Sequence, residues 1–316
     1  MIRAAIDIGT VTCRLLIADI EQGIERPLVR ECRITDLGIG VSQTGLLRAD
    51  AIDRVVSCIA DYRDLCDALA SEQGLAELPI TAIATSAARD ARNSDRLVRA
   101  LGEFSVDLHI IPGALEADLS FRGASCQFPG EQLVVVDVGG GSTEVIFGTG
   151  EEGIVFAHSF DIGCRRMTER FLASDPPTAE ELACAKAYLV DELHSVLGIR
   201  LEAYRIDRVV AVAGTATSVV SVNEAMEVYD SDRVNKTVVP AATLAAVLER
   251  LAALTEAQRK TVVGLEPKRA GVIVAGMLIL QSVLEVLGQG SFTVSESDIL
   301  QGVIQTAGEH SDIFAR

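Results

Sequence analysis

Residues 137–144 read Asp-Val-Gly-Gly-Gly-Ser-Thr-Glu and continue an apolar segment that is typical of a buried strand. Three consecutive glycines leave the backbone N–H groups of this turn open to an oxyanion, and Ser142 and Thr143 add hydroxyl donors. Asp137 and Glu144 carry the hard oxygen ligands that suit Mg²⁺, directly or through water. The residue order matches neither a Walker loop nor a G-x-G-x-x-G fingerprint. We interpret the segment as a phosphate cradle with metal ligands at its rim; the alternative is a tight hairpin turn.

A second copy of this pattern lies 130 residues earlier (137 − 7), where residues 7–14 read Asp-Ile-Gly-Thr-Val-Thr-Cys-Arg. Each copy joins two apolar segments and places an Asp at the turn. The repeat predicts two similar domains that face one cleft. The boundary is expected at Cys126–Gln132, where Pro129 and Gly130 interrupt the pattern.

Strand-like and helix-like segments alternate along the chain, which predicts the α/β class with mixed sheets covered on both faces. The capping signal Thr178-x-x-Glu181 marks one helix start. Strands are expected at 4–8, 14–20, 27–35, 80–84, 108–111, 133–138, 144–148, 154–160 and 208–212. Helices are expected at 49–69, from 94, from 114, at 178–197, from 215, at 243–254 and at 269–287. A last helix, 296–310, is expected to pack back on the first domain.

The chain is acidic, with 28 Lys and Arg residues against 45 Asp and Glu and a net charge of −17. This balance argues against nucleic acid as a partner, but an anionic small substrate stays open because a metal ion or helix terminus can outweigh the global field. The seven cysteines are odd in number and form no C-x-x-C pair, so a reducing cytoplasm is expected. The chain shows no signal-peptide pattern at its start. Its longest apolar stretch, 271–284, is too short to span a membrane.

Three further positions are candidate site residues with ordinary alternatives. Gly214 and Thr215 sit where a strand passes into a helix, which fits an anion site or a plain turn with a Thr cap. Arg89 is either a phosphate contact or a solvated helix charge. Glu116 falls in the first turn of an expected helix, as a general base or as a carboxylate that stabilises the helix dipole.

Together these motifs resemble the Ppx/GppA phosphatases, which are exopolyphosphatases and guanosine pentaphosphate phosphohydrolases of the sugar kinase–Hsp70–actin superfold. The resemblance covers nearly the whole chain, and Arg165–Pro177 looks most like the short actinobacterial exopolyphosphatases. It implies two actin-like (ribonuclease H-like) domains, 1–125 and 126–316, that flank a cleft. The segments that carry it are AIDIGTVTCRLLIAD (5–19), ATSAARDARN (84–93), IIPGALEADLSFRGA (110–124), VVVDVGGGSTE (134–144), AVAGTATS (211–218), RAGVIVAGMLIL (269–280) and SESDILQGVI (295–304).

The resemblance implies a Mg²⁺ ion held by Asp7, Asp137 and Glu144, with a monovalent cation such as K⁺ as a candidate companion. It implies that Glu116 acts as the general base. Taken with the motifs, phosphate contacts are predicted for Gly9, Thr10, Thr12, Arg14, Arg89, Gly139, Gly140, Gly141, Ser142, Gly214 and Thr215.

The implied function is Mg²⁺-dependent hydrolysis of the terminal phosphoanhydride bond of inorganic polyphosphate, with a preference for short chains because the surface is acidic. Removal of the 5′ γ-phosphate of pppGpp, as part of a stringent response, is the alternative within the same class. A sensor that binds (p)ppGpp or polyphosphate with little turnover is a third reading, since Val11, Leu115 and Asp118 depart from the family pattern. A kinase or filament protein of the same superfold has no supporting motif. A homodimer is the candidate assembly.

Overall fold

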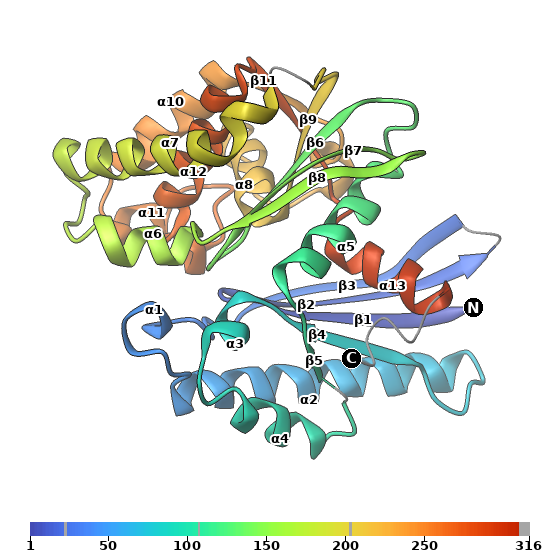
Figure 1. Ribbon diagram of the computed structural model, residues 1–316. Helices are drawn as coiled ribbons and strands as arrows, with labels where there is room; N and C mark the ends of the chain where they lie inside the picture. The colour runs from blue at the N-terminus through green and yellow to red at the C-terminus, as the bar shows by residue number, and fades with distance from the viewer. Residues whose placement is uncertain (22–23, 107, 202–203, 310–316) are drawn as a thin grey trace. The chain divides into compact units, whose positions relative to one another are not determined.

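The computed structural model describes residues 1–21, 24–106, 108–201 and 204–309. The chain divides into two compact units (Figure 1). Unit 1 is Met1–Gly123 together with the segment that begins at Ile299, and unit 2 is Ala124–Asp298. Each unit is built on its own mixed sheet with helices, so the predicted α/β class is confirmed.

The sheet of unit 1 has the strand order β3-β2-β1-β4-β5. The first three strands form an antiparallel meander, and β4 and β5 run parallel to β1. Alternating and fully apolar runs account for these strands, because every other side chain enters the core. The strands are β1 (Ile2–Ile8), β2 (Thr12–Glu21), β3 (Ile24–Ile34), β4 (Ile80–Ala84) and β5 (Leu108–Ile110).

Helices cover both faces of this sheet. The long helix α2 places Val55, Ile59 and Tyr62 at helical spacing in one core cluster. Leu300 and Val303 of α13 pack in a second cluster, with Leu16 of β2, and Figure 1 shows α13 (red) beside β1 and β2. The helices of unit 1 are α1 (Val41–Thr44), α2 (Ala49–Glu72), α3 (Ser86–Asp90), α4 (Asp95–Gly102), α5 (Gly113–Ser125, whose last residues belong to unit 2) and α13 (Ile299–Glu309).

Unit 2 repeats the arrangement of unit 1. Its sheet has the order β10-β11-β9-β6-β7-β8, in which β6, β7 and β8 form the antiparallel meander and β9 and β11 continue in parallel from β6. The extra strand β10 pairs antiparallel with β11. The strands are β6 (Leu133–Val138), β7 (Thr143–Thr149), β8 (Gly153–Phe160), β9 (Arg208–Val212), β10 (Val238–Pro240) and β11 (Ser291–Val294).

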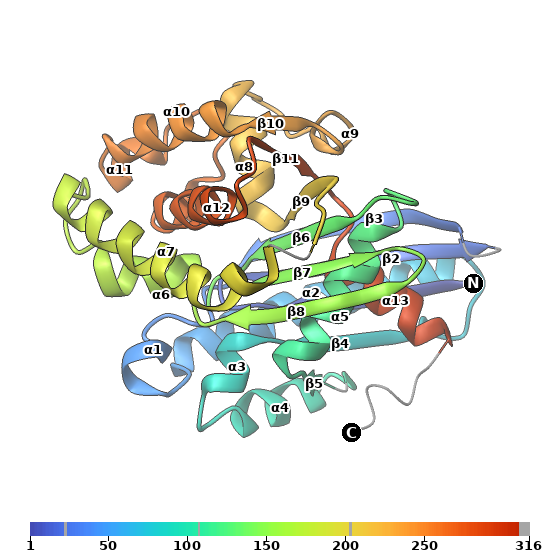
Figure 2. The same cartoon turned by 45° about the horizontal axis from the view of Figure 1, so that its top comes forward.

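The helix α12 (Ile273–Leu287) forms the centre of the unit 2 core, because it is apolar all round and its residues are nearly all buried. It packs between α7 (Ala179–Leu201) and α10 (Ala241–Ala252), as Figure 2 shows. The other helices are α6 (Cys164–Phe171), α8 (Ala213–Asn223), α9 (Ser231–Val234), α11 (Glu256–Arg259) and the 3₁₀ turn η1 (Pro267–Arg269). Among the described helices, none combines the length and apolar character that crossing a membrane requires.

Two helices begin three and four residues later than expected. The last helix was expected from residue 296 but begins at Ile299, because the Ser295 hydroxyl donates to the Ser297 carbonyl and accepts from its N–H in a tight turn. Residue 310, the expected end, lies outside the described residues. The helix expected from Arg269 begins at Ile273, since Arg269 closes the separate 3₁₀ turn after Pro267.

Several expected elements are confirmed. The Thr178 capping box is present: Glu181 N–H donates to the Thr178 hydroxyl at 3.2 Å, and Thr178 N–H donates to Glu181 Oε2 at 2.8 Å. The strands 80–84, 133–138 and 208–212 have the expected bounds. Neither α6 nor β11 is predicted from the sequence, because their short segments carry little periodic signal.

Candidate active site

The parallel strands of unit 1 end together at one edge of its sheet. Ile8 of β1 pairs with Ala84 of β4, which pairs with Ile110 of β5. The chain leaves these three strands into the turn 9–12, into α3 and into α5. Carboxyl ends of parallel strands are where open α/β sheets bind ligands, so this edge of unit 1 is a natural site.

Asp7 and Arg14 face each other across the β1–β2 hairpin. Both Nε and Nη2 of Arg14 donate to Oδ2 of Asp7, at 3.1 and 2.7 Å. The intervening turn closes when Gly9 N–H donates to the Thr12 carbonyl at 2.8 Å. The structure therefore brings two predicted site residues together as an ion pair, one of them a predicted metal ligand and the other a predicted phosphate contact.

Glu116 lies in the first turn of α5, where its N–H donates to the carbonyl of Pro112. Its Oε2 accepts a hydrogen bond from Nη1 of Arg89 at 2.8 Å. The same Arg89 nitrogen donates to the Ile111 carbonyl at 3.2 Å. Arg89 thus joins α3 to the end of the neighbouring strand and holds the predicted base, a contact that the sequence reading did not anticipate.

Unit 2 has the equivalent edge, where β6, β9 and β11 end. Asp137 pairs with Val212 of β9, and Ala211 pairs with Val294 of β11. The turn 139–142 leaves β6 at this edge and α8 leaves β9. The Gly-rich turn and the Gly214 segment, 70 or more residues apart in the sequence, are therefore neighbours in the fold of one unit.

Asp137 and Glu144 face each other across the β6–β7 hairpin, in the register positions that Asp7 and Arg14 occupy in unit 1. Glu144 is buried, and its Oε1 accepts from the Ser159 hydroxyl at 2.6 Å. Ser159 is the cross-strand partner of Glu144 on β8. Ser159 is not among the predicted site residues, although the alternation of side chains along β8 places it on the same face of the sheet as Glu144.

The turn 139–142 is bound on one side by the start of α6. Cys164 N–H donates to the Gly139 carbonyl at 2.9 Å, and the N–H groups of Arg165 and Arg166 donate to the Gly140 carbonyl at 2.9 and 3.2 Å. In a trans peptide the C=O and N–H point in opposite directions, so the N–H groups of Gly140 and Gly141 face away from α6. Neither donates to a backbone carbonyl of the described residues. Adjacent outward N–H groups form an anion-binding concavity.

The glycines of this turn are not required by backbone conformation, because Gly139, Gly140 and Gly141 are not among the residues with positive φ. Close approach of the backbone instead requires a glycine at position 163. A Cβ built on Gly163, next to α6, would lie 2.4 Å from the backbone of both Gly140 and Gly141. The expected hydroxyl donor Thr143 is corrected: its hydroxyl donates to the Ile162 carbonyl and is used in the fold.

Gly214 and Thr215 lie in the first turn of α8, directly after its first residue Ala213, which has a positive φ of 64°. Such a conformation in a residue with a Cβ is costly and is concentrated at functional sites. The guanidinium of Arg269 lies against Gly214, since a Cβ there would meet its Cζ at 2.0 Å. Arg269 is not among the site residues predicted from the sequence; the structure places it at the candidate site of unit 2.

The three departures from the family pattern have local structural roles. The carbonyl of Val11 accepts from the N–H groups of Thr35 and Asp36. Leu115 packs against the core cluster that includes α13. Asp118 forms an i,i+4 ion pair with Arg122 at 2.7 Å. Each residue is accommodated in unit 1 without a change in the strand order that positions the site.

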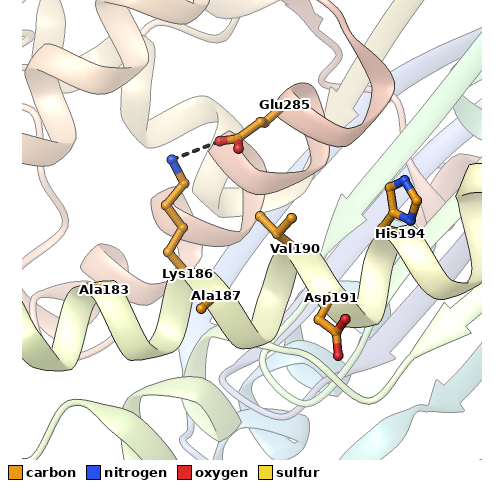
Figure 3. Close-up of a pocket in the computed structure, with 7 residues that line it drawn as sticks. All are labelled: Ala183, Lys186, Ala187, Val190, Asp191, His194 and Glu285. Atoms are coloured by element: carbon orange, nitrogen blue, oxygen red, sulfur yellow. Dashed lines mark ion pairs between the residues drawn. The ribbon is translucent and has the colours of Figure 1, made fainter.

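A surface pocket elsewhere in unit 2 contains none of the predicted site residues. It lies between α7 and α12, has a volume of about 610 Å³, and is crossed by the Lys186–Glu285 ion pair at 2.8 Å (Figure 3). Its lining residues are Ala183, Lys186, Ala187, Val190, Asp191, His194 and Glu285. No group of three or more metal-ligating side chains is assembled there or elsewhere in the described residues.

Several known proteins have similar sequences, and several solved structures share this architecture. Exopolyphosphatase 2 of Mycobacterium tuberculosis is 39% identical, over 95% of this chain and 96% of that protein. Exopolyphosphatase 1 of the same organism is 29% identical, over 95% and 86%. The crystal structure of an exopolyphosphatase from Cytophaga hutchinsonii has a TM-score of 0.85 at 27% identity, over 97% of each chain.

A Ppx/GppA family member from Aquifex aeolicus has a TM-score of 0.80 at 29% identity, over 99% of each chain. The model of the Ppx/GppA phosphatase family matches residues 16–308, which is most of the chain. The chain therefore belongs to the Ppx/GppA phosphatase family.

Proposed function

We propose that this protein hydrolyses the terminal phosphoanhydride bond of inorganic polyphosphate, with Mg²⁺ as cofactor. The observation that carries the proposal is the turn 139–142, whose N–H groups at Gly140 and Gly141 face away from α6 at the carboxyl edge of the unit 2 sheet. The relatives named exopolyphosphatases support polyphosphate as the substrate class.

Asp137 and Glu144 fit a Mg²⁺ site in which phosphate oxygens of the substrate and water supply the remaining ligands. Asp137 and Glu144 are cross-strand neighbours with hard carboxylate oxygens, and Ser159 orients Glu144. The described residues contain no cluster of three or more such ligands. Mg²⁺ usually binds through one or two carboxylates plus phosphates and water, so Asp137 and Glu144 would hold it together with the substrate. The ion, when bound, neutralises negative charge on the phosphate oxygens.

The protein's own residues supply positioning and a proton acceptor. Backbone N–H groups of the 139–142 turn bind oxygens of the terminal phosphate, and the Arg269 guanidinium beside Gly214 adds positive charge. Glu116, held by Arg89, accepts a proton from the attacking water. The new P–O bond forms as the bridging P–O bond to the rest of the chain breaks. The products are inorganic phosphate and a polyphosphate one unit shorter, with the water's second hydrogen retained on phosphate.

The proposed substrates are short polyphosphate chains in preference to long ones. The protein carries a net charge of −17, and like charges repel within a Debye length of about 8–10 Å. The candidate site can neutralise the terminal few phosphates only, through the turn and its neighbouring cations. Additional phosphates gain no further attraction from an acidic surface, so release of the shortened chain after each cleavage is expected.

The test is phosphate release by the purified protein on triphosphate, long polyphosphate, pppGpp and ATP, with and without Mg²⁺. The proposal expects Mg²⁺-dependent release from triphosphate and polyphosphate at a higher kcat/KM than from pppGpp. A higher kcat/KM on pppGpp would replace polyphosphate with pppGpp as substrate. Absence of release from all four, with binding retained, would instead favour a sensor.

A further inference from the structure

In each unit, hydrogen bonds from the segment after the third strand of the meander fix carbonyl groups of the turn at the candidate site. In unit 1, the segment that follows β3 binds the turn: Gly38 N–H donates to the Thr10 carbonyl at 2.8 Å, and Thr35 and Asp36 N–H groups both donate to the Val11 carbonyl at 3.0 Å. Every one of these donors is a backbone amide. The carbonyls of Thr10 and Val11 therefore point towards the segment after the third strand of the meander.

In unit 2, the segment that follows β8 also donates hydrogen bonds to the carbonyls of the turn, but one of the donors is a side chain. Backbone N–H groups at the start of α6 bind the carbonyls of Gly139 and Gly140. The carbonyl of Gly141, which stands in the place of Val11 by the alignment of the two turns, accepts instead from Nε of the Arg166 side chain at 2.8 Å. A side chain in unit 2 thus occupies the place of two backbone donors in unit 1.

The Gly141 carbonyl belongs to the same peptide plane as the N–H of Ser142. Because that peptide is planar and trans, fixing the carbonyl towards Arg166 fixes the Ser142 N–H in the opposite direction, beside the N–H groups of Gly140 and Gly141. A charged donor on the carbonyl also polarises the peptide, which makes its N–H a stronger donor. Arg166 therefore orients the N–H of Ser142, which is the third outward N–H of the turn after those of Gly140 and Gly141.

The ion pair that Arg166 forms with Asp161 is weaker than its hydrogen bond to the Gly141 carbonyl. Its ion pair with Asp161 measures 3.7 Å, and the Asp161 side chain is 84% exposed, so water screens that pair. The start of α6 is held close to the turn, because Gly163 contacts the backbone of Gly140 and Gly141. The Arg166 side chain is only 20% exposed, in contrast to a solvated surface arginine.

We propose that Arg166 is a positioning residue for phosphate binding, which orients the Ser142 N–H through the Gly141 carbonyl. The inference rests on the proposed function, because it assumes that the turn binds phosphate. It assigns a role to a residue whose sequence context, Arg165–Arg166, is that of a short surface basic cluster.

Arg166→Ala is the test variant, and Arg170→Ala is the matched control. Arg170 lies on the same helix, but its guanidinium packs over the rings of Tyr188 and Phe171 instead of the turn. Two readouts are measured: amide hydrogen exchange of the peptide that contains residues 139–142, with and without inorganic phosphate, and the steady-state constants on triphosphate. Arg166→Lys and added guanidinium ion test whether a cation at this place restores function.

Removal of a charged hydrogen bond predicts a rise in KM of about tenfold to a hundredfold in Arg166→Ala. Exchange in 139–142 should accelerate and protection by inorganic phosphate should fall, while Arg170→Ala matches wild type in both. Guanidinium ion should lower KM in Arg166→Ala and leave Arg170→Ala unchanged. If Arg166→Ala equals Arg170→Ala in exchange and KM, the inference is overturned.

The wild-type protein separates this inference from the proposed function. If wild type releases no phosphate from triphosphate or polyphosphate, the proposed function fails. The exchange measurement with inorganic phosphate then still decides the role of Arg166: faster exchange and lost protection in Arg166→Ala support it, and exchange equal to the control overturns it.

Discussion

Arg89 and Glu116, 27 residues apart in the sequence, are hydrogen-bonded to each other in the candidate site. Nη1 of Arg89 lies 2.8 Å from Oε2 of Glu116 and 3.2 Å from the carbonyl oxygen of Ile111. Glu116 is buried in the first turn of α5. A charge-assisted hydrogen bond from an arginine that is itself anchored to a backbone carbonyl limits the carboxylate to a small range of orientations. Such restraint is what positioning a general base requires.

Glu116→Gln should lower kcat on triphosphate by roughly 10²–10⁴-fold, because the amide cannot accept a proton from water. KM and the thermal unfolding midpoint should change little, since the amide has the shape of the carboxylate and can still accept from Arg89. Asp118→Asn is the matched control, as it removes a carboxylate from the same helix. Near-full activity of Glu116→Gln would reduce Glu116 to a residue that stabilises the helix terminus.

Arg89→Ala separates two roles for this arginine. If Arg89 orients Glu116, kcat should fall by about tenfold or more, in keeping with the loss of a charged hydrogen bond, and KM should stay nearly constant. If Arg89 instead binds phosphate, as the sequence reading predicts, KM should rise. The steady-state constants of Arg89→Ala decide, with Arg122→Ala, the partner of Asp118, as the control for loss of an arginine in unit 1.

Asp137→Ala should weaken Mg²⁺ binding in the presence of a slowly hydrolysed polyphosphate analogue. Mg²⁺ alone should bind weakly to both wild type and variant, because the site is completed by phosphate oxygens. Titration calorimetry with and without the analogue measures both affinities. Asp191→Ala is a suitable control, since Asp191 is an exposed carboxylate of α7, at the surface pocket that contains none of the predicted site residues. Equal Mg²⁺ affinity of Asp137→Ala and wild type with the analogue present would exclude Asp137 as a ligand.

A chain-length series resolved on a gel, with enzyme limiting, should show a ladder of intermediates early in the reaction. The physical reason is the acidic surface, which offers no extended attraction to hold a shortened chain. Specificity should be higher for short chains than for long ones. Disappearance of long chains without intermediates would reveal an extended binding track and contradict the proposal.

Ellman's reagent should modify three of the seven cysteines rapidly in the native protein. Cys32, Cys126 and Cys184 are exposed, whereas Cys13, Cys58, Cys66 and Cys164 are buried. Burial also raises the pKa of the Cys66 thiol to about 11, which keeps it protonated at pH 8. The remaining four should react only after unfolding in guanidinium chloride. Rapid reaction of all seven under native conditions would contradict the burial of Cys13, Cys58 and Cys66 in unit 1 and of Cys164 in unit 2.

The sequence by itself determined the strands that contain the site and the turns that follow them. Apolar runs such as 80–84 and 133–138 form strands because their side chains must be buried wherever they lie in the fold. The repeat of Asp7 and Asp137 predicted two equivalent hairpins, and both have the same register and the same closing hydrogen bond, from Gly9 to Thr12 and from Gly139 to Ser142. These features are local, so neighbouring residues specify them.

Only the tertiary structure decided which side chains act on those turns. Ser159 reaches Glu144, Arg89 reaches Glu116, and Arg166 reaches Gly141 across separations of 15, 27 and 25 residues. Arg269 reaches Gly214 from a 3₁₀ turn that lies beyond three intervening helices. Each contact depends on strand register and on where a helix begins, to within one residue, because a shift of one position turns a side chain to another face. Residue type and spacing set what an arginine can bind; the packed sheet and helices set what it does bind.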